Sequence, residues 1–177
     1  MARCSGMTLT ELLFTLLIVA TVIGWGLPGV EALVADSRQT ADINAFVTAV
    51  QLARSEAAKR GSAVVLCNTA DFARCGTDAA DYGAGWMVFV DEDGASPPGR
   101  SDDEPLLYGY QPGSEGPIVS NRRLFEFRAF RKRSTNGTVT FCDRRGADSA
   151  RALIVSYTGR PRVSVSGPGG RALLCPA

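Results

Sequence analysis

The stretch Gly6-Met7-Thr8-Leu9-Thr10-Glu11 leads directly into an apolar run, residues 12–30, that contains no charged side chain. These nineteen residues, rising about 1.5 Å each, form a helix about 28 Å long, close to the hydrocarbon thickness of a bilayer. The run is therefore long enough to cross a membrane. Glu11 lies at its start, and a carboxylate inside a transmembrane helix costs about 2.5–3.5 kcal/mol, so we expect Glu11 to have a specific partner.

The start of the chain does not fit a secretory signal peptide, whose apolar core is shorter and ends in a small-residue cleavage site. With the Gly6-Met7 junction before the apolar run and Glu11 five residues into the shortened chain, it resembles a type IV prepilin signal. The resemblance implies that prepilin peptidase cuts after Gly6 and methylates the amino group of Met7. It also implies that Glu11 neutralises the terminal ammonium of a neighbouring pilin, so that neither charge is buried alone. An ordinary signal anchor with an incidental acid is the alternative.

Three segments are expected along the chain. Residues 1–6 form a cleaved leader, residues 7–61 a helix with residues 9–30 as a single inner-membrane span, and residues 62–177 a periplasmic or extracellular β domain. Beyond the membrane the helix is amphipathic, because apolar residues recur at three- and four-residue steps up to its expected end at Gly61. Pro28 and the glycines around it favour a kink in the membrane half.

After Gly61 the pattern changes to short runs rich in Val, Phe, Tyr and Ile, separated by Gly, Pro, Asn and Asp. These runs predict antiparallel strands at residues 63–68, 86–91, 104–110, 118–130, 138–142, 152–158 and 161–166. Asn136-Gly137 predicts a hairpin between the basic strand before it and the strand after it, and Thr158-Gly159 predicts a second hairpin. The expected fold class is α+β, with one long N-terminal transmembrane and amphipathic helix packed on one or two antiparallel sheets.

Five cysteines are present, and Cys4 would leave with the leader. The remaining even set in an exported domain predicts two disulfides. Three connectivities are open, and Cys67 with Cys75 and Cys142 with Cys175 is favoured because the first closes a short loop and the second holds the C-terminus. Zinc is the competing explanation for four thiols, but the chain has no histidine and no Cys-x-x-Cys pair. We expect no metal and no cofactor.

Charge is distributed unevenly although the net charge is only +1. Residues 1–117 carry seven Lys/Arg against fifteen Asp/Glu, whereas residues 118–177 carry twelve against three, a net charge of +9. Almost all of these cations are arginine, which contacts phosphate in a bidentate manner and stacks on bases. Nucleic acid is therefore a candidate partner. The basic residues are Arg122, Arg123, Arg128, Arg131, Lys132, Arg133, Arg144, Arg145, Arg151, Arg160, Arg162 and Arg171.

The most specific element of this region is Gly159-Arg160-Pro161-Arg162. Residues two apart on a strand point to the same face, so Arg160 and Arg162 are expected to project together about 6.6 Å apart. Pro161 donates no backbone hydrogen bond and favours an edge strand, which would leave the pair accessible. A purely structural interpretation has equal weight: these arginines discourage edge-to-edge aggregation or pair with the acidic loops at residues 91–93 and 102–104.

The prepilin-like start, the strand Trp86-Met87-Val88-Phe89-Val90-Asp91 with its acidic Gly94 turn, and the closing Ser156-Tyr157-Thr158-Gly159-Arg160-Pro161-Arg162 together resemble the FimT/GspH family of minor pilins and pseudopilins. The Gly-Arg-x-Arg tail is specific to FimT-like members, where it binds DNA during natural transformation. The resemblance thus implies DNA binding by Arg160 and Arg162, with Gly159 as the turn residue. Auxiliary contacts, suggested by charge alone, are Arg122, Arg123, Arg131, Lys132, Arg133, Arg144 and Arg145, with the Arg122–Arg133 and Arg144–Arg151 segments as their source.

Two functions are open at this point. The first is a minor pilin that joins a type IV pilus, contacts other pilins through its N-terminal helix and binds extracellular DNA without reading its sequence. The second is a GspH-like pseudopilin that primes a type II secretion filament and touches only proteins. Catalysis is not expected, because the usual nucleophile and base pairs are missing. Asp91, Asp93 and Gly94 match part of a calcium loop, but its later ligands are absent from the required spacing and a hairpin turn is favoured.

Overall fold

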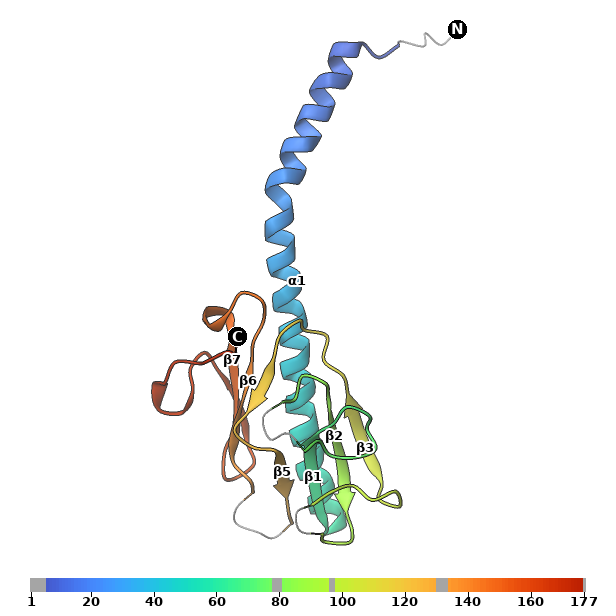
Figure 1. Ribbon diagram of the computed structural model, residues 1–177, viewed down its shortest axis with the longest axis vertical. Helices are drawn as coiled ribbons and strands as arrows, with labels where there is room; N and C mark the ends of the chain where they lie inside the picture. The colour runs from blue at the N-terminus through green and yellow to red at the C-terminus, as the bar shows by residue number, and fades with distance from the viewer. Residues whose placement is uncertain (1–5, 78–80, 96–97, 130–133, 177) are drawn as a thin grey trace. The chain divides into compact units, whose positions relative to one another are not determined.

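The computed structural model describes residues 6–77, 81–95, 98–129 and 134–176, and describes no side chains for residues 25–28. The chain divides into two compact units, Met1–Ser37 and Arg38–Ala177. The elements, in chain order, are α1 (Leu9–Arg60), β1 (Ala63–Asn68), β2 (Trp86–Asp91), β3 (Leu106–Tyr110), β4 (Ile118–Ser120), β5 (Leu124–Phe127), β6 (Gly137–Phe141), η1 (Ala147–Ser149), β7 (Arg151–Val155), β8 (Pro161–Ser164) and η2 (Pro168–Gly170) (Figure 1).

Both ends of α1 are capped. At the start, the Glu11 amide donates to the Thr8 hydroxyl at 3.3 Å, the contact of a Ser/Thr-x-x-Glu capping box. At the end, Gly61 has a φ of 70° and its amide donates to the Ala57 carbonyl at 3.0 Å, as in left-handed helix termini. The end predicted at Gly61 is therefore confirmed. The glycines and proline at positions 24–29 do not end the helix, which is assigned without a break through them.

The first unit exposes an apolar helix. Most of the large apolar side chains along it are more than half exposed, among them Leu9 at 76% and Phe14 at 67%. By length and composition this part of α1 could cross a membrane. Because large apolar side chains are rarely left in water along a whole helix, this surface requires a nonpolar environment.

The second unit contains two four-stranded antiparallel sheets with the C-terminal part of α1 packed against both. The first sheet has the order β3-β2-β1-β5 and the second the order β4-β6-β7-β8. Phe46 of α1 is fully buried, with its ring 5.1 Å from that of Trp86 in the first sheet and 6.1 Å from that of Phe141 in the second. Such edge and tilted ring contacts add to the burial of apolar area. One core therefore joins the helix to both sheets, in agreement with the expected α+β fold.

Two polar side chains on the buried face of the helix fix it to the strands and loops around it. Asp42 is fully buried and accepts hydrogen bonds from the Tyr110 hydroxyl and from the amides of Gly113 and Ser114, each at 3.0 Å. Burial, together with the bond to Asp42, raises the pKa of Tyr110 to about 12. Gln39 donates to the carbonyls of Phe141 and Ser149, both at 3.2 Å. These contacts set the position of the helix along the domain.

Two strand predictions are wrong. The single strand expected at residues 118–130 is two strands, β4 and β5, which belong to different sheets. The hairpin expected at Asn136-Gly137 does not form, because β5 pairs with β1 while β6 pairs with β4 and β7. The physical reason is that Asn121 extends the β4 pairing: its amide donates to the Thr138 carbonyl at 3.1 Å and its side chain accepts from the Thr138 amide at 2.8 Å. That edge of β6 is therefore occupied before β5 begins.

The cysteines pair as the favoured connectivity has them. Cys67 is bonded to Cys75 and Cys142 to Cys175, with sequence separations of 8 and 33 residues. The second bond joins the end of β6 to the C-terminal segment and closes a loop that contains the whole β7–β8 hairpin. In the chain-entropy description the longer loop contributes more, about 4 kcal/mol against about 2.5 kcal/mol for the short one.

Candidate nucleic-acid interface

The second predicted hairpin is confirmed and joins β7 to β8. Val155 pairs with Pro161 and Ile154 with Arg162, so β8 is the edge strand of the second sheet. The Ser156 amide donates to the Arg160 carbonyl at 3.1 Å and the Gly159 amide to the Ser156 carbonyl at 2.8 Å. This closes a three-residue loop with its last residue in the left-handed region, a common hairpin connection.

Gly159 is required at this turn for two reasons. Its φ of 71° is a conformation that side chains with a Cβ adopt at a cost. A Cβ there would also lie 3.0 Å from Arg54 Cδ and 3.2 Å from Phe127 Cε1. The turn is thus in close contact with the Arg54 side chain of α1. Arg54 was not among the predicted site residues, because nothing in its local helical pattern indicates what it contacts.

Arg160 and Arg162 are both exposed, but they are not equivalent. Arg162 lies in β8 opposite Ile154, whose side chain packs in the outer cluster near the Cys142–Cys175 disulfide, so Arg162 belongs to the face of the sheet turned away from the core. Arg160 precedes β8 and closes the turn, with its amide donating to the Ser156 hydroxyl at 3.1 Å. Arg160 thus lies one residue before the start of β8, and its projection on the same side as Arg162 stays a prediction. Neither forms a salt bridge with any described residue, including the acids of the 91–93 and 102–104 loops.

Arg122 lies at the same end of the second sheet as this turn. Its Cγ packs beside Gly137, and its Nε donates to the Asn136 carbonyl at 3.0 Å. Gly137 pairs with Val155, the last residue of β7 before the turn. Neighbouring strands are about 4.8 Å apart, so β6 and β8 are separated by about 10 Å. We call this end the basic end and define it by Arg54, Arg122, Arg160 and Arg162, all exposed and without an acidic partner in the described part of the chain.

An aromatic side chain accompanies these arginines. Tyr157, at the tip of the turn, is 59% exposed, and its carbonyl accepts a hydrogen bond from the Ser134 amide at 2.8 Å. Exposed aromatic rings beside arginines are the usual platform for stacked bases. Tyr157 belongs to the sequence motif, but its exposure at the turn is seen only in the structure. The predicted contacts Arg131, Lys132 and Arg133 lie outside the described residues.

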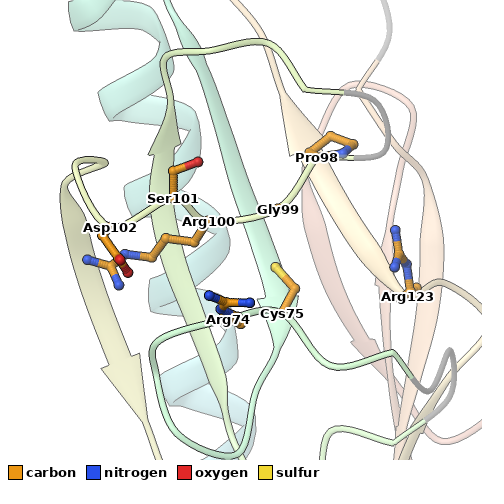
Figure 2. A pocket seen from close by; sticks show the side chains of 8 residues that line it. All are labelled: Arg74, Cys75, Pro98, Gly99, Arg100, Ser101, Asp102 and Arg123. Atoms are coloured by element: carbon orange, nitrogen blue, oxygen red, sulfur yellow. The ribbon is translucent and has the colours of Figure 1, made fainter.

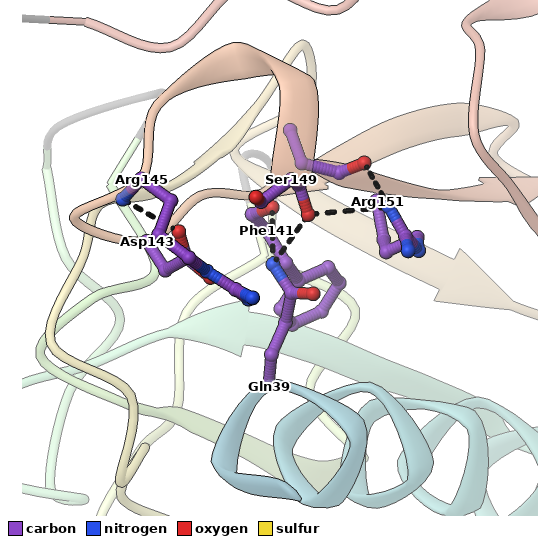
Figure 3. Close-up of polar contacts among 7 residues, drawn as sticks. Gln39, Phe141, Asp143, Arg145, Ser149 and Arg151 are labelled. Atoms are coloured by element: carbon purple, nitrogen blue, oxygen red, sulfur yellow. Dashed lines mark hydrogen bonds and ion pairs between the residues drawn. The ribbon is translucent and has the colours of Figure 1, made fainter. Parts of the chain in front are cut away.

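Arg144 and Arg145 lie at the opposite end of β7, in the connection from β6. Arg144 pairs with Glu115, which also binds Arg38 at 3.0 Å. Arg145 donates from Nε to Asp143 at 2.9 Å, and Figure 3 shows this pair beside the Gln39 contacts. That hydrogen bond holds the pKa of Asp143 below its usual value. We call this the paired end, defined by Arg38, Glu115, Asp143, Arg144 and Arg145.

Arg123 takes part in a third feature, a shallow pocket that it lines together with Arg74, Arg100 and the Cys75 edge of the first disulfide (Figure 2). Arg100 donates to the carbonyls of Phe72 and Ala73, both at 3.4 Å. Asp102 also lines the pocket and reduces its positive charge. The structure therefore separates Arg123 from Arg122 and assigns the two neighbours to different surfaces.

The residues predicted for processing and assembly lie in the first unit. Gly6 precedes the helix, and Met7 is 63% exposed. Glu11 is exposed in the first turn of α1, where a negative charge suits the positive end of the helix dipole. The capping contact with Thr8 gives the Glu11 position a local role that the sequence analysis did not consider.

Comparison with known proteins covers most of the second unit. The family model described as type II transport protein GspH matches residues 42–159, about two thirds of the chain. Two crystal structures of the type IV minor pilin FimU of Pseudomonas aeruginosa match with a TM-score of 0.53. One is 21% identical and covers 79% of this chain and 98% of its own, and the other is 22% identical and covers 82% and 96%. No curated protein matches the chain.

The extent of these matches shows which parts of the chain resemble the family and the FimU structures. At such identities the FimU likeness concerns the fold, one long helix on antiparallel sheets. The family match ends at Gly159, so Arg160 and Arg162 lie just beyond it. It includes the helix face that carries Asp42 and Phe46, the whole first sheet, and β4, β6 and β7 of the second sheet up to the glycine of the turn, but neither β8 nor Cys175. The chain therefore belongs to the GspH family of pilin-like proteins, with the fold of a type IV minor pilin.

Proposed function

We propose that the protein is a minor pilin that assembles into a type IV pilus and binds extracellular DNA during natural transformation. The observation that carries this proposal is the basic end. Four exposed arginines without acidic partners among the described residues lie around one turn, although the domain contains more than enough carboxylates to neutralise them. Uncompensated arginines at an exposed sheet end attract a polyanion.

The first unit supports the assembly part of the proposal. We propose that prepilin peptidase removes residues 1–6 and leaves Met7 as the new terminus. The apolar part of α1, residues 9–30, then holds the subunit in the inner membrane as a single span, with residues 62–177 in the periplasm, until the subunit enters the pilus. In the filament the same apolar surface packs against other pilins, and Glu11 neutralises the terminal ammonium of a neighbour.

The chemistry of the basic end favours binding without sequence readout. Its arginines come from a helix, a strand connection and a hairpin, so they form no single helix or ribbon to enter a major groove. Guanidinium groups contact phosphates, which carry no sequence information. Tyr157 adds a ring on which an unpaired base can stack regardless of its identity. The expected complex is therefore strongly salt-dependent and tolerant of sequence.

The test is a salt titration of DNA binding by the processed full chain in a non-ionic detergent. Fluorescence anisotropy with a labelled duplex gives the dissociation constant between 50 and 300 mM salt. Each phosphate neutralised contributes about −0.9 to the slope of log K against log salt. We expect the R160A/R162A double variant to bind more weakly at every salt concentration and to flatten the slope by about two units.

The matched control is R38A/R144A, which removes the same charge from the paired end. Both of these arginines are exposed and already bound to Glu115, so their loss should change the slope little. Equal weakening by the two double variants would mean that net charge alone drives binding and would overturn the assignment of the site. Unchanged binding by R160A/R162A would overturn it as well.

A second candidate function follows from the description of the matched family. A type II transport protein would act as a pseudopilin that primes a secretion filament through protein contacts alone. That function predicts no measurable DNA binding by the wild-type chain even at 50 mM salt. The same titration therefore distinguishes the two, before any variant is made.

A further inference from the structure

Three carboxylates lie close together at the end of β2 and at the two ends of the connection from β2 to β3. One oxygen each from Asp91, Asp93 and Glu104 lies within 4.8 Å of the others. Glu104 reaches this position because β2 and β3 are antiparallel neighbours, and the Val90 amide donates to the Pro105 carbonyl at 3.1 Å. The pairing of the strands, not a continuous loop motif, therefore assembles the group.

Two of the three carboxylates are buried. Asp91 and Glu104 are each 4% exposed, whereas Asp93 is exposed. Glu104 accepts hydrogen bonds from the amides of Glu92 at 2.8 Å and Ser101 at 2.9 Å. Asp91 Oδ1 accepts from the Gly94 amide at 3.0 Å, but Asp91 Oδ2 is buried without any partner among the described residues. A buried carboxylate oxygen that lacks a donor is rare in folded proteins and requires an explanation.

No described cation of the protein compensates this group. Within the described residues, none of the three carboxylates forms a salt bridge. Nearby polar contacts come from backbone amides and from the Ser101 hydroxyl, which donates to Asp93 at 3.2 Å. Three like charges at this distance repel one another, and two of them are largely removed from water. The group has the charge and the oxygen donors of a cation site.

We propose that Asp91, Asp93 and Glu104 bind a calcium ion. Calcium takes six to eight oxygen ligands at about 2.3–2.6 Å in a flexible geometry, whereas magnesium demands a near-ideal octahedron at about 2.0–2.1 Å and gives up its waters reluctantly. Three carboxylate oxygens within 4.8 Å of one another, brought together by strand pairing in an irregular arrangement, therefore suit calcium better than magnesium, and a bound ion would also give the buried Asp91 Oδ2 a partner. Water and backbone carbonyls would complete the coordination.

The arrangement also explains why the sequence does not match the pattern of a continuous calcium-binding loop. Asp91 and Asp93 have the spacing of such a loop, but the third carboxylate, Glu104, comes from the end of the connection just before β3. Three carboxylates with solvent ligands correspond to an affinity of about 10⁻⁴ to 10⁻³ M, as in extracellular calcium modules. The ion would tie the end of β2 to the start of β3.

The experiment is a calcium titration of the full chain in a non-ionic detergent, after treatment with a chelator. Calorimetry should show saturable binding of calcium chloride below about 1 mM and much weaker binding of magnesium chloride. At 10 mM calcium, about twenty times a dissociation constant of 0.5 mM, the folding equilibrium constant should rise about twentyfold, seen as a higher unfolding temperature. No heat and no shift at 10 mM calcium would overturn the proposal, and an equal response to magnesium would overturn the choice of ion.

The matched variants are D93N and D103N. Both remove one exposed carboxylate from the same connection, but only Asp93 belongs to the group. We expect D93N to weaken calcium binding at least tenfold and D103N to leave it within twofold. Equal loss in the two variants would show that the ion responds to the general negative charge of the connection, and would overturn the site.

Discussion

The two ends of the second sheet carry the same kind of side chain in opposite circumstances. At the paired end, Arg144 and Arg145 each bind a carboxylate that is close in space. At the basic end, Arg160 and Arg162 have no such partner in the described part of the chain. The length of β7, five residues or about 17 Å, separates the two.

The difference shows that a count of cations overstates the surface available to a polyanion. The +9 charge of residues 118–177 includes arginines whose guanidinium groups are already occupied by acids from both halves of the sequence. Glu115, which lies before the basic region, neutralises Arg144 within it. The position of carboxylates, more than the number of arginines, determines which end can bind DNA.

The largest expected contrast is between a variant of the paired end, which should lose stability, and a variant of the basic end, which should lose DNA binding. D143A removes the carboxylate that accepts hydrogen bonds from the Arg145 side chain, at a site where the Asp143 side chain is only 5% exposed. Since hydrogen bonds to charged groups contribute about 1.5–3 kcal/mol, we expect the free energy of unfolding to fall by about 2–3 kcal/mol, with DNA binding unchanged. R160A/R162A should do the reverse, with stability within about 0.5 kcal/mol. Urea unfolding followed by tryptophan fluorescence measures the stability of both variants, and fluorescence anisotropy measures their DNA binding.

The pH dependence of stability tests whether the effect of D143A comes from the ion pair. The pKa of Asp143 is lowered in the folded state, so its contribution is present above the unfolded pKa, about 3.9, and is lost as the pH falls through the folded value. The stability difference between wild type and D143A should therefore be full at pH 7 and should shrink as the pH is lowered below about 3.9. A difference that stays constant as the pH falls through the acid range would point to lost packing and contradict the ion-pair explanation.

Much of the fold was predictable because its signals are local. The helix end at Gly61, the strands β1 and β2 and the Thr158-Gly159 hairpin each depend on residues adjacent in sequence, where periodicity and turn chemistry decide the structure. Asn136-Gly137 has the stronger local hairpin signal of the two, yet the hairpin predicted there does not form. Its partner strand was already taken by the Asn121 pairing, so the contacts of a distant segment overrode a local preference.

The candidate site was only partly predictable, for the same reason. The Gly-Arg-x-Arg motif indicated Arg160 and Arg162, but Arg54 reaches the turn from a helix more than one hundred residues earlier in the chain. No sequence pattern relates a helical arginine to a hairpin that packs beside it. The pairing of Arg144 and Arg145 with acids was likewise invisible, because it depends on how loops meet in space.

An intermediate effect is expected at the glycines of the two ends. Gly159 at the basic end and Gly146 at the paired end have φ values of 71° and 85°, but only Gly159 has side chains within 4 Å of its Cβ position. Alanine at Gly159 should cost about 1–2 kcal/mol for the positive φ, and alanine at Gly146 at least as much, because its ψ of −160° lies in a region that is almost exclusive to glycine. Only G159A should also displace Arg54 and weaken DNA binding. The expected loss of affinity is about two- to fivefold, because at most one phosphate contact is lost. Urea unfolding and anisotropy on the same samples compare them, and equal binding by the two variants would remove Arg54 from the site.

The smallest expected effect tests whether the basic end offers charge alone or the geometry of arginine. R160K/R162K retains both charges, so the slope of log K against log salt should stay within about half a unit of the wild type. Lysine lacks the planar fork that binds phosphate in a bidentate manner and stacks on bases, so the affinity at a fixed salt concentration should fall severalfold, by less than about 1.4 kcal/mol. If R160K/R162K also flattens the slope, the lysines fail to reach the phosphates and position is decisive. If affinity and slope both match the wild type, the basic end acts as a pair of point charges, and any polyanion of similar charge density should compete with DNA equally well.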